Sequence, residues 1–145
     1  MSMDLYVFYD GQFPNLIEWQ KTIDGFGFDL KFSRDQILIG EGGLLKAKWK
    51  TRDASFEFRP CDFDKLTETY DDIDFGRRWS TAYAFYWSGL PECVAAYIAA
   101  VTLAQMRDGV VFDPQDSLIL RDQEAIRMAR ENELLLPKIE ASLRH

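Results

Sequence analysis

The sequence contains one histidine in 145 residues, and that histidine, His145, is the last residue. A terminal side chain is poorly held, so it cannot serve as a positioned general base. The lack of any other histidine excludes Ser-His-Asp and Cys-His catalysis, as well as zinc sites built on histidine. We therefore expect no catalytic residue of these classes.

Cysteine, basic targeting residues and long apolar runs are also scarce. Cys61 and Cys93 are the only cysteines, and they form no CxxC pattern. The first ten residues carry acids where a secretory signal would carry bases. The longest apolar stretch, residues 91–106, is shorter than the roughly 20 residues of a membrane span. These absences predict a cytoplasmic protein with reduced thiols.

The charge balance narrows the classes of partner. The net charge is -7, from 24 acidic and 17 basic residues. Such a balance disfavours nucleic acid and anionic membrane as partners, and it permits a basic protein. Hydrophobic residues make up 47% of the chain, and its length suits one domain, so we expect residues 1–145 to form a single folded unit.

The stretch 91–106, PECVAAYIAAVTLAQM, predicts the central helix of that domain. Alanine is the strongest helix former, Pro91 suits a first turn, and Gly109 suits the position after the helix end. Only Glu92 carries a formal charge in this stretch. A helix that is apolar nearly all round should be buried nearly all round.

Alternating patterns predict strands before this helix. The run 4–9 is apolar on both faces and predicts a strand inside a sheet, while 28–32, 37–39 and 82–87 indicate further strands. The runs 45–50 and 54–59 predict an antiparallel hairpin. Its aromatic face would be buried, and its lysines would lie exposed opposite Glu57.

Helices are expected at 14–23, within 62–74, and from Asp122 to a break or kink at Pro137. The segments 110–112 and 118–120 predict a short ribbon. The order of elements favours the α+β class, with an antiparallel-dominated sheet and helices packed on one face.

The segment 62–74 carries a dense acidic run. Its phenylalanine, leucine and tyrosine recur at helical spacing, so the acids should lie on the outer face of a short helix. Three readings stay open: a solvated surface, a docking surface for a basic partner, and a metal or catalytic carboxylate site. The calcium-loop pattern requires an acid at its fifth position and a glutamate at its twelfth. A loop that starts at Asp72 would have Gly76 and Tyr83 at these positions, so the pattern is absent. The acids are Asp62, Asp64, Glu68, Asp71, Asp72 and Asp74.

Arg77, Arg78 and Trp79 form the one compact basic and aromatic cluster. Arginine beside tryptophan is a common composition of binding hot spots. Alternatively, the two arginines neutralise the preceding acids. Ser88 lacks a surrounding GxSxG pattern, so it is not expected to be a nucleophile, and Ser88 or Gly89 is expected to cap the central helix. We expect no cofactor and no tight structural metal, because the chain lacks cysteine and histidine at ligand spacing.

The C-terminal part of the chain carries a loose motif. An alanine-rich helix runs into residues 108–114, DGVVFDP, followed by a short strand and a helix rich in arginine and glutamate. This arrangement resembles small uncharacterised bacterial cytoplasmic proteins, some of which are similar to immunity proteins encoded beside secreted toxins. The resemblance implies a stoichiometric inhibitor that binds a toxin, and no family functional residue maps onto this chain.

Two hypotheses follow. In the first, the protein is not an enzyme and binds a basic protein, such as a toxin domain, through the acidic run with the Arg77–Trp79 cluster nearby. In the second, it is a small enzyme or ligand-binding domain that uses carboxylates and Arg77 or Arg78 in a pocket. A deep apolar pocket would favour the second, and a flat or ridged acidic face would favour the first.

Overall fold

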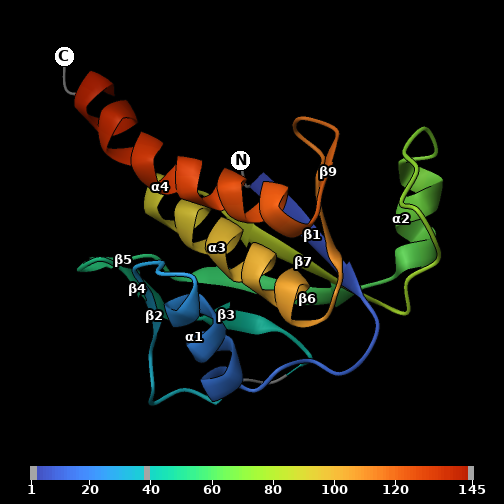
Figure 1. The fold of residues 1–145 in the computed structure, drawn as a ribbon, viewed down its shortest axis with the longest axis horizontal. Coiled ribbons are helices and arrows are strands. Elements are labelled where there is room, and N and C mark those ends of the chain that lie inside the picture. Colours follow the sequence, from blue (N-terminus) through green and yellow to red (C-terminus); the bar gives the residue numbers. More distant parts are fainter. Residues whose placement is uncertain (1–2, 38–39, 144–145) are drawn as a thin grey trace.

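The computed structural model describes residues 3–37 and 40–143, which form two antiparallel sheets and four helices (Figure 1). The larger sheet has the strand order β3-β6-β7-β1-β8-β9, and the smaller one has the order β2-β4-β5. The α+β class and the antiparallel sheet are thus confirmed. The elements are β1 (Met3–Tyr9), α1 (Leu16–Gly25), β2 (Leu30–Phe32), β3 (Gly43–Leu45), β4 (Ala47–Trp49), β5 (Arg52–Asp53), β6 (Phe56–Cys61), α2 (Phe63–Thr69), β7 (Thr81–Trp87), α3 (Leu90–Met106), β8 (Val110–Asp113), β9 (Leu118–Leu120) and α4 (Asp122–Leu143).

Strand β1 lies inside the larger sheet, as its apolar sequence predicts. It pairs with β7 over its whole length and with β8 at Tyr6, Val7 and Phe8. Side chains alternate across a strand. Val7 therefore enters the core under the helices, whereas Phe8 enters a second aromatic core on the other face. Both faces of β1 are buried because each is covered by a different layer.

Helix α3 is the buried centre of the main core. All side chains from 94 to 104 are buried, between the larger sheet and the helices α1 and α4 (Figure 1). The indole nitrogen of Trp19 on α1 donates to the Ala99 carbonyl oxygen at 3.1 Å and to Thr102 Oγ1 at 3.1 Å. The prediction of a central buried helix is confirmed.

The predicted hairpin at 45–59 is divided between the two sheets. Strand β4 pairs with β2 and β5, whereas β3 pairs with β6. The side chain of Gln36 gives a local reason, since its amide donates to the Lys46 carbonyl oxygen at 2.7 Å and its oxygen accepts from the Lys46 nitrogen at 2.9 Å. Those backbone groups are therefore withdrawn from a continuous ladder. Leu44, not a lysine, lies opposite Glu57.

The burial pattern of that segment is nevertheless as predicted. Trp49, Phe56 and Phe58 are buried. The three lysines at 46, 48 and 50 are exposed. The alternation of buried and exposed side chains was therefore predicted correctly, but the pairing of the strands was not.

Helix α2 departs from the predicted arrangement of helices on one face. Helices α1, α3 and α4 cover one face of the larger sheet, and α2 with its following loop covers part of the opposite face (Figure 1). The reason is that the second face of the central strands is itself aromatic and needs a cover. Phe63 of α2 supplies it by packing against Phe8, with ring centroids 5.0 Å apart.

Helix α4 runs through Pro137 without ending there, and it extends beyond the other elements (Figure 1). Arg52 of β5 holds its end through a two-point ion pair to Glu140, at 2.5 and 2.7 Å. In the predicted strand 37–39, Ile37 is not in a strand and the other two residues lie outside the described residues. Within 3–37 and 40–143, no helix combines the length and the apolar character needed to cross a membrane.

Candidate functional site

The acidic run forms a separate lobe on the second face of the larger sheet. We call residues 62–79 the acidic lobe; it begins where β6 ends, and Figure 1 shows it projecting at the end of the molecule away from β2, β4 and β5. Asp62 caps α2, because its carboxylate accepts from the Asp64 backbone nitrogen at 2.9 Å. An N-cap of this kind contributes about 1 kcal/mol.

Aromatic side chains fasten the lobe to the sheet. Phe63 and Phe75 meet Phe8 edge to face, at centroid distances of 5.0 and 5.2 Å. Tyr70 lies 4.9 Å from Phe112 of β8. Such pairs add about 0.5–1.5 kcal/mol each beyond the area that they bury. The lobe is therefore packed against the sheet through an aromatic core that the two share.

The loop after α2 is ordered by Asp74 and Trp79. The Asp74 carboxylate accepts from the Gly76 nitrogen at 2.8 Å, and the Trp79 indole donates to the Phe75 carbonyl oxygen at 3.0 Å. The Arg77 guanidinium lies 4.2 Å from the centroid of the Trp79 ring and forms an ion pair with Asp10. Arg77 is thus neutralised by an acid outside the lobe.

Arg78 neutralises an acid within the lobe. Its guanidinium lies 2.8 Å from the Asp64 carboxylate, and both side chains are more than half exposed. An exposed pair of this kind contributes about 0–1 kcal/mol. Both arginines of the Arg77–Trp79 cluster are therefore engaged with carboxylates, but only Arg78 neutralises one of the preceding acids, because Arg77 pairs with Asp10.

The six acids fall into two groups. Asp62 and Asp74 order the backbone, and Asp64 is paired with Arg78. The other three are exposed and have no ion-pair partner within 4.0 Å among the described residues. We call them the free acids: Glu68, Asp71 and Asp72.

Two shallow hollows lie against the acidic lobe, with volumes of about 450 and 410 Å³. Their charged lining consists of residues that already bind one another, including the Asp64–Arg78 pair. Cys61 lines the first hollow, and burial raises the pKa of its thiol to about 12. That thiol is therefore a poor nucleophile at neutral pH. The hollows offer no activated nucleophile and no unengaged pair of acid and base.

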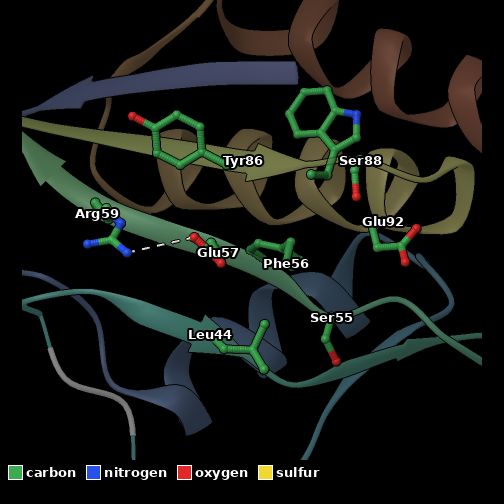
Figure 2. Close-up of a pocket in the computed structure, with 9 residues that line it drawn as sticks. Leu44, Ser55, Phe56, Glu57, Arg59, Tyr86, Ser88 and Glu92 are labelled. Atoms are coloured by element: carbon green, nitrogen blue, oxygen red, sulfur yellow. Dashed lines mark ion pairs between the residues drawn. The ribbon is translucent and has the colours of Figure 1, made fainter. Parts of the chain in front are cut away.

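A further hollow of about 570 Å³ was not predicted from the sequence (Figure 2). It is built from β3, β6, β7 and the start of α3, so its residues are too far apart in the chain to form a recognisable pattern. Figure 2 shows the Glu57–Arg59 ion pair, at 3.8 Å, on one side and Ser88 with Glu92 on the other.

Glu92 is the unusual group of this hollow, because its Oε2 is buried without a hydrogen-bond partner among the described residues. The carboxylate folds back over the start of α3, where a Cβ built on Gly89 would lie 2.3 Å from Oε2. A carboxylate in this position interacts favourably with the positive end of the helix dipole. Gly89, not Ser88, is the N-cap residue, and it has no side chain to cap with. The position of the Glu92 carboxylate at the start of α3 therefore explains why its Oε2 is buried there.

No group of three or more His, Cys, Asp or Glu side chains within 3–37 and 40–143 is arranged to hold a metal ion. The acids of the lobe are spread along α2 and its loop, and half of them are engaged in caps or ion pairs. The chemical property that the acidic lobe offers is negative charge at fixed positions.

The chain matches no family model, no curated protein and no solved structure.

Proposed function

We propose that this protein is a non-enzymatic binding protein whose acidic lobe docks onto a basic protein partner. The observation that carries the proposal is the position of the free acids. Glu68, Asp71 and Asp72 are exposed and unpaired, on a segment that packs against the sheet through their shared aromatic core. Fixed charges of one sign steer a partner of the opposite sign during diffusional encounter.

The resemblance of the C-terminal third to immunity-type proteins suggests which basic partner this is. We propose a toxin domain as the partner, and inhibition by stoichiometric binding in the bacterial cytoplasm as the role. The alternative, an enzyme or ligand-binding domain with Arg77 or Arg78 in a pocket, has less support. Both guanidiniums are already engaged, and the nearby hollows are shallow and lined by charged groups that are held in ion pairs or by backbone hydrogen bonds.

The decisive experiment reverses the free acids without touching the residues that order the lobe. The variant Glu68→Lys/Asp71→Lys/Asp72→Lys keeps the Asp62 cap, the Asp74 turn and the Asp64–Arg78 pair. A matched control, Asp29→Lys/Glu41→Lys/Asp116→Lys, changes the net charge equally at exposed positions outside the lobe. Both variants should remain folded, since exposed substitutions usually change stability by no more than about 0.5 kcal/mol each.

The measurement is association kinetics, at several salt concentrations, with a protein that co-purifies with this one or is encoded beside it. We expect the lobe variant to associate at least about tenfold more slowly at low salt. The difference should shrink as salt rises, because the screening length is about 10 Å at 0.1 M ionic strength. Equal rates for the lobe and control variants would show that net charge alone matters, and would refute the proposal.

A further inference from the structure

Strands β2, β4 and β5 lie at the end of the molecule away from the acidic lobe (Figure 1), and the surface there carries charge of the opposite sign. The exposed face of the small sheet and the neighbouring face of α1 contain two hollows of about 670 and 580 Å³. Lys31 and Phe32 of β2 line both, so the two hollows adjoin. We call the joined hollows the basic groove. Its cations are Lys21, Lys31, Arg34, Lys46 and Lys48.

Most of these cations have no carboxylate partner. Only Lys31 forms an ion pair, with Asp24 at 2.7 Å. The other four have no acid within 4.0 Å among the described residues. Among the described residues that line the groove, Asp24 and Asp53 are the only acids, which leaves an excess of three positive charges along its lining. This excess stands out in a chain whose net charge is -7.

The strand register concentrates the charge further. Lys31 of β2 and Lys48 of β4 are direct cross-strand partners, and both side chains are exposed. Like charges in this position are unfavourable for a sheet. Asp53 lies opposite Lys48 on the other side and offsets part of the repulsion. Two lysines side by side do not stabilise the sheet. They would, however, interact favourably with an anionic partner.

Apolar side chains border the same groove. Ile17 of α1 is 73% exposed and Leu44 of β3 is 58% exposed. Ile17 lines one hollow and Leu44 lines the other. The surface therefore combines dispersed positive charge with aliphatic side chains at its two ends.

Two kinds of ligand fit this surface poorly. A small anion would need converging donors, but the Ser33 and Ser55 hydroxyls already donate to Asp35 and Asp53. An added β-strand would need a free edge on β2, but the Gln20 side chain occupies it. The Gln20 amide donates to the Leu30 carbonyl oxygen at 2.9 Å, and its oxygen accepts from the Phe32 nitrogen at 2.8 Å.

We propose that the basic groove binds an extended acidic segment of a second protein. Acidic side chains of the segment pair with the unpartnered lysines and Arg34, and an aliphatic side chain packs beside Ile17. Recognition runs through side chains, because the Gln20 side chain covers the edge of β2 and the Gln36 side chain binds the backbone of Lys46. The groove lies at the other end of the molecule from the free acids, so this surface is independent of the function proposed above.

The test uses a fluorescently labelled peptide of about ten residues, roughly 33 Å long when extended, made of glutamates with two leucines. A second peptide carries glutamine at every glutamate position. Binding is measured by fluorescence anisotropy at low salt, with the whole protein. The groove variant is Lys21→Gln/Lys46→Gln/Lys48→Gln, and the matched control is Lys65→Gln/Arg121→Gln/Lys138→Gln, exposed positions outside the groove.

We expect the wild type and the control variant to bind the acidic peptide equally and the glutamine peptide at least about tenfold more weakly. The groove variant should lose about tenfold in affinity for the acidic peptide. Ile17→Ser, which leaves every charge in place, should lose about fivefold. Unchanged binding by the groove variant would overturn the proposal.

Two further measurements test whether the groove binds a different occupant. Vesicles of phosphatidylserine and phosphatidylcholine test a membrane, and binding to vesicles without binding to the peptide would reject the proposal. Sedimentation velocity tests a second copy of the chain. Self-association that the groove variant abolishes would assign the surface to the protein itself and would likewise reject it.

Discussion

Gly109 lies so close to Phe8 that a Cβ at this position would come within 2.2 Å of the Phe8 carbonyl oxygen. The Gly109 nitrogen also donates to the Ala104 carbonyl oxygen at 2.8 Å, which closes the end of α3. Gly109, in the turn between α3 and β8, therefore packs directly against the backbone of β1. Glycine is required here because the neighbouring atom is backbone and cannot move aside.

Gly109→Ala should consequently destabilise the protein by about 3 kcal/mol, the upper end of the cost of over-packing. Gly25→Ala is the matched control, because a Cβ there has no neighbour within 4 Å. The control should be neutral or should stabilise by up to about 1 kcal/mol. Urea denaturation of both variants makes the comparison, and equal stabilities would show that the contact relaxes at little cost.

Phe56→Ala should cost about 3–5 kcal/mol, as is usual for a buried aromatic side chain. Phe56 is 2% exposed, and its ring centroid lies 5.7 Å from that of Phe85. Leu44→Ala, on the neighbouring strand but facing solvent, should cost less than about 1 kcal/mol. A loss below about 1 kcal/mol for Phe56→Ala, again by chemical denaturation, would contradict the observed register of β6.

The buried Asp113 carboxyl should make stability depend on pH. Burial raises its pKa above the ordinary value, while the hydrogen bond from the Tyr97 hydroxyl acts in the opposite direction. The folded protein therefore keeps a proton that the unfolded chain has lost. Its contribution to the free energy of unfolding should fall as pH rises from about 4 through the raised pKa.

Asp113→Asn isolates this effect. The free energy of unfolding of the wild type, relative to that of Asp113→Asn, should decline over the same range of pH. Tyr97→Phe removes the donor that favours the ionised carboxylate, so it should extend the decline to higher pH. Denaturation curves at a series of pH values give both results, and parallel curves for wild type and Asp113→Asn would disprove the assignment.

Both thiols should react slowly in the folded protein. Burial raises the pKa of Cys61 to about 12 and that of Cys93 to about 11. At pH 8 the thiolate fraction should be more than about a hundredfold below that of an ordinary cysteine. Thiol labelling at pH 8, with and without urea, measures this. Labelling of the folded chain at the rate of the unfolded one would contradict it.

Removal of metal ions should leave the protein unchanged. The described residues contain no cluster of three potential ligands, and three of the six lobe acids are already engaged in caps and an ion pair. Extensive dialysis against a chelator should therefore shift the melting temperature by less than about 1 °C. A drop of several degrees would indicate a site that the geometry does not reveal.

Local periodicity was enough to predict much of the fold. The apolar residues Val7 and Phe8 on opposite faces of β1, the alternation of Phe56 with Glu57, and the alanine pattern of α3 indicate which faces are buried. A side chain's burial depends mainly on its own polarity and on the period of its element, so it is written into consecutive residues. The class, the central helix and the buried aromatic face followed from that alone.

Tertiary structure decided what each buried face packs against and which charges remain free. Periodicity carries no information about partners distant in the chain, so the hairpin at 45–59 was expected to be continuous, and α2 to lie with the other helices. The contact of Phe63 with Phe8 places α2 on the opposite face of the sheet. The hydrogen bond between Gln36 and the Lys46 backbone accompanies the division of the hairpin between two sheets. Likewise, six acids close together in sequence were separated into caps, an ion pair and the three free acids. Cations distant in sequence, such as Lys21 and Lys48, came together in one groove, because only chain folding sets the distances on which electrostatic interactions depend.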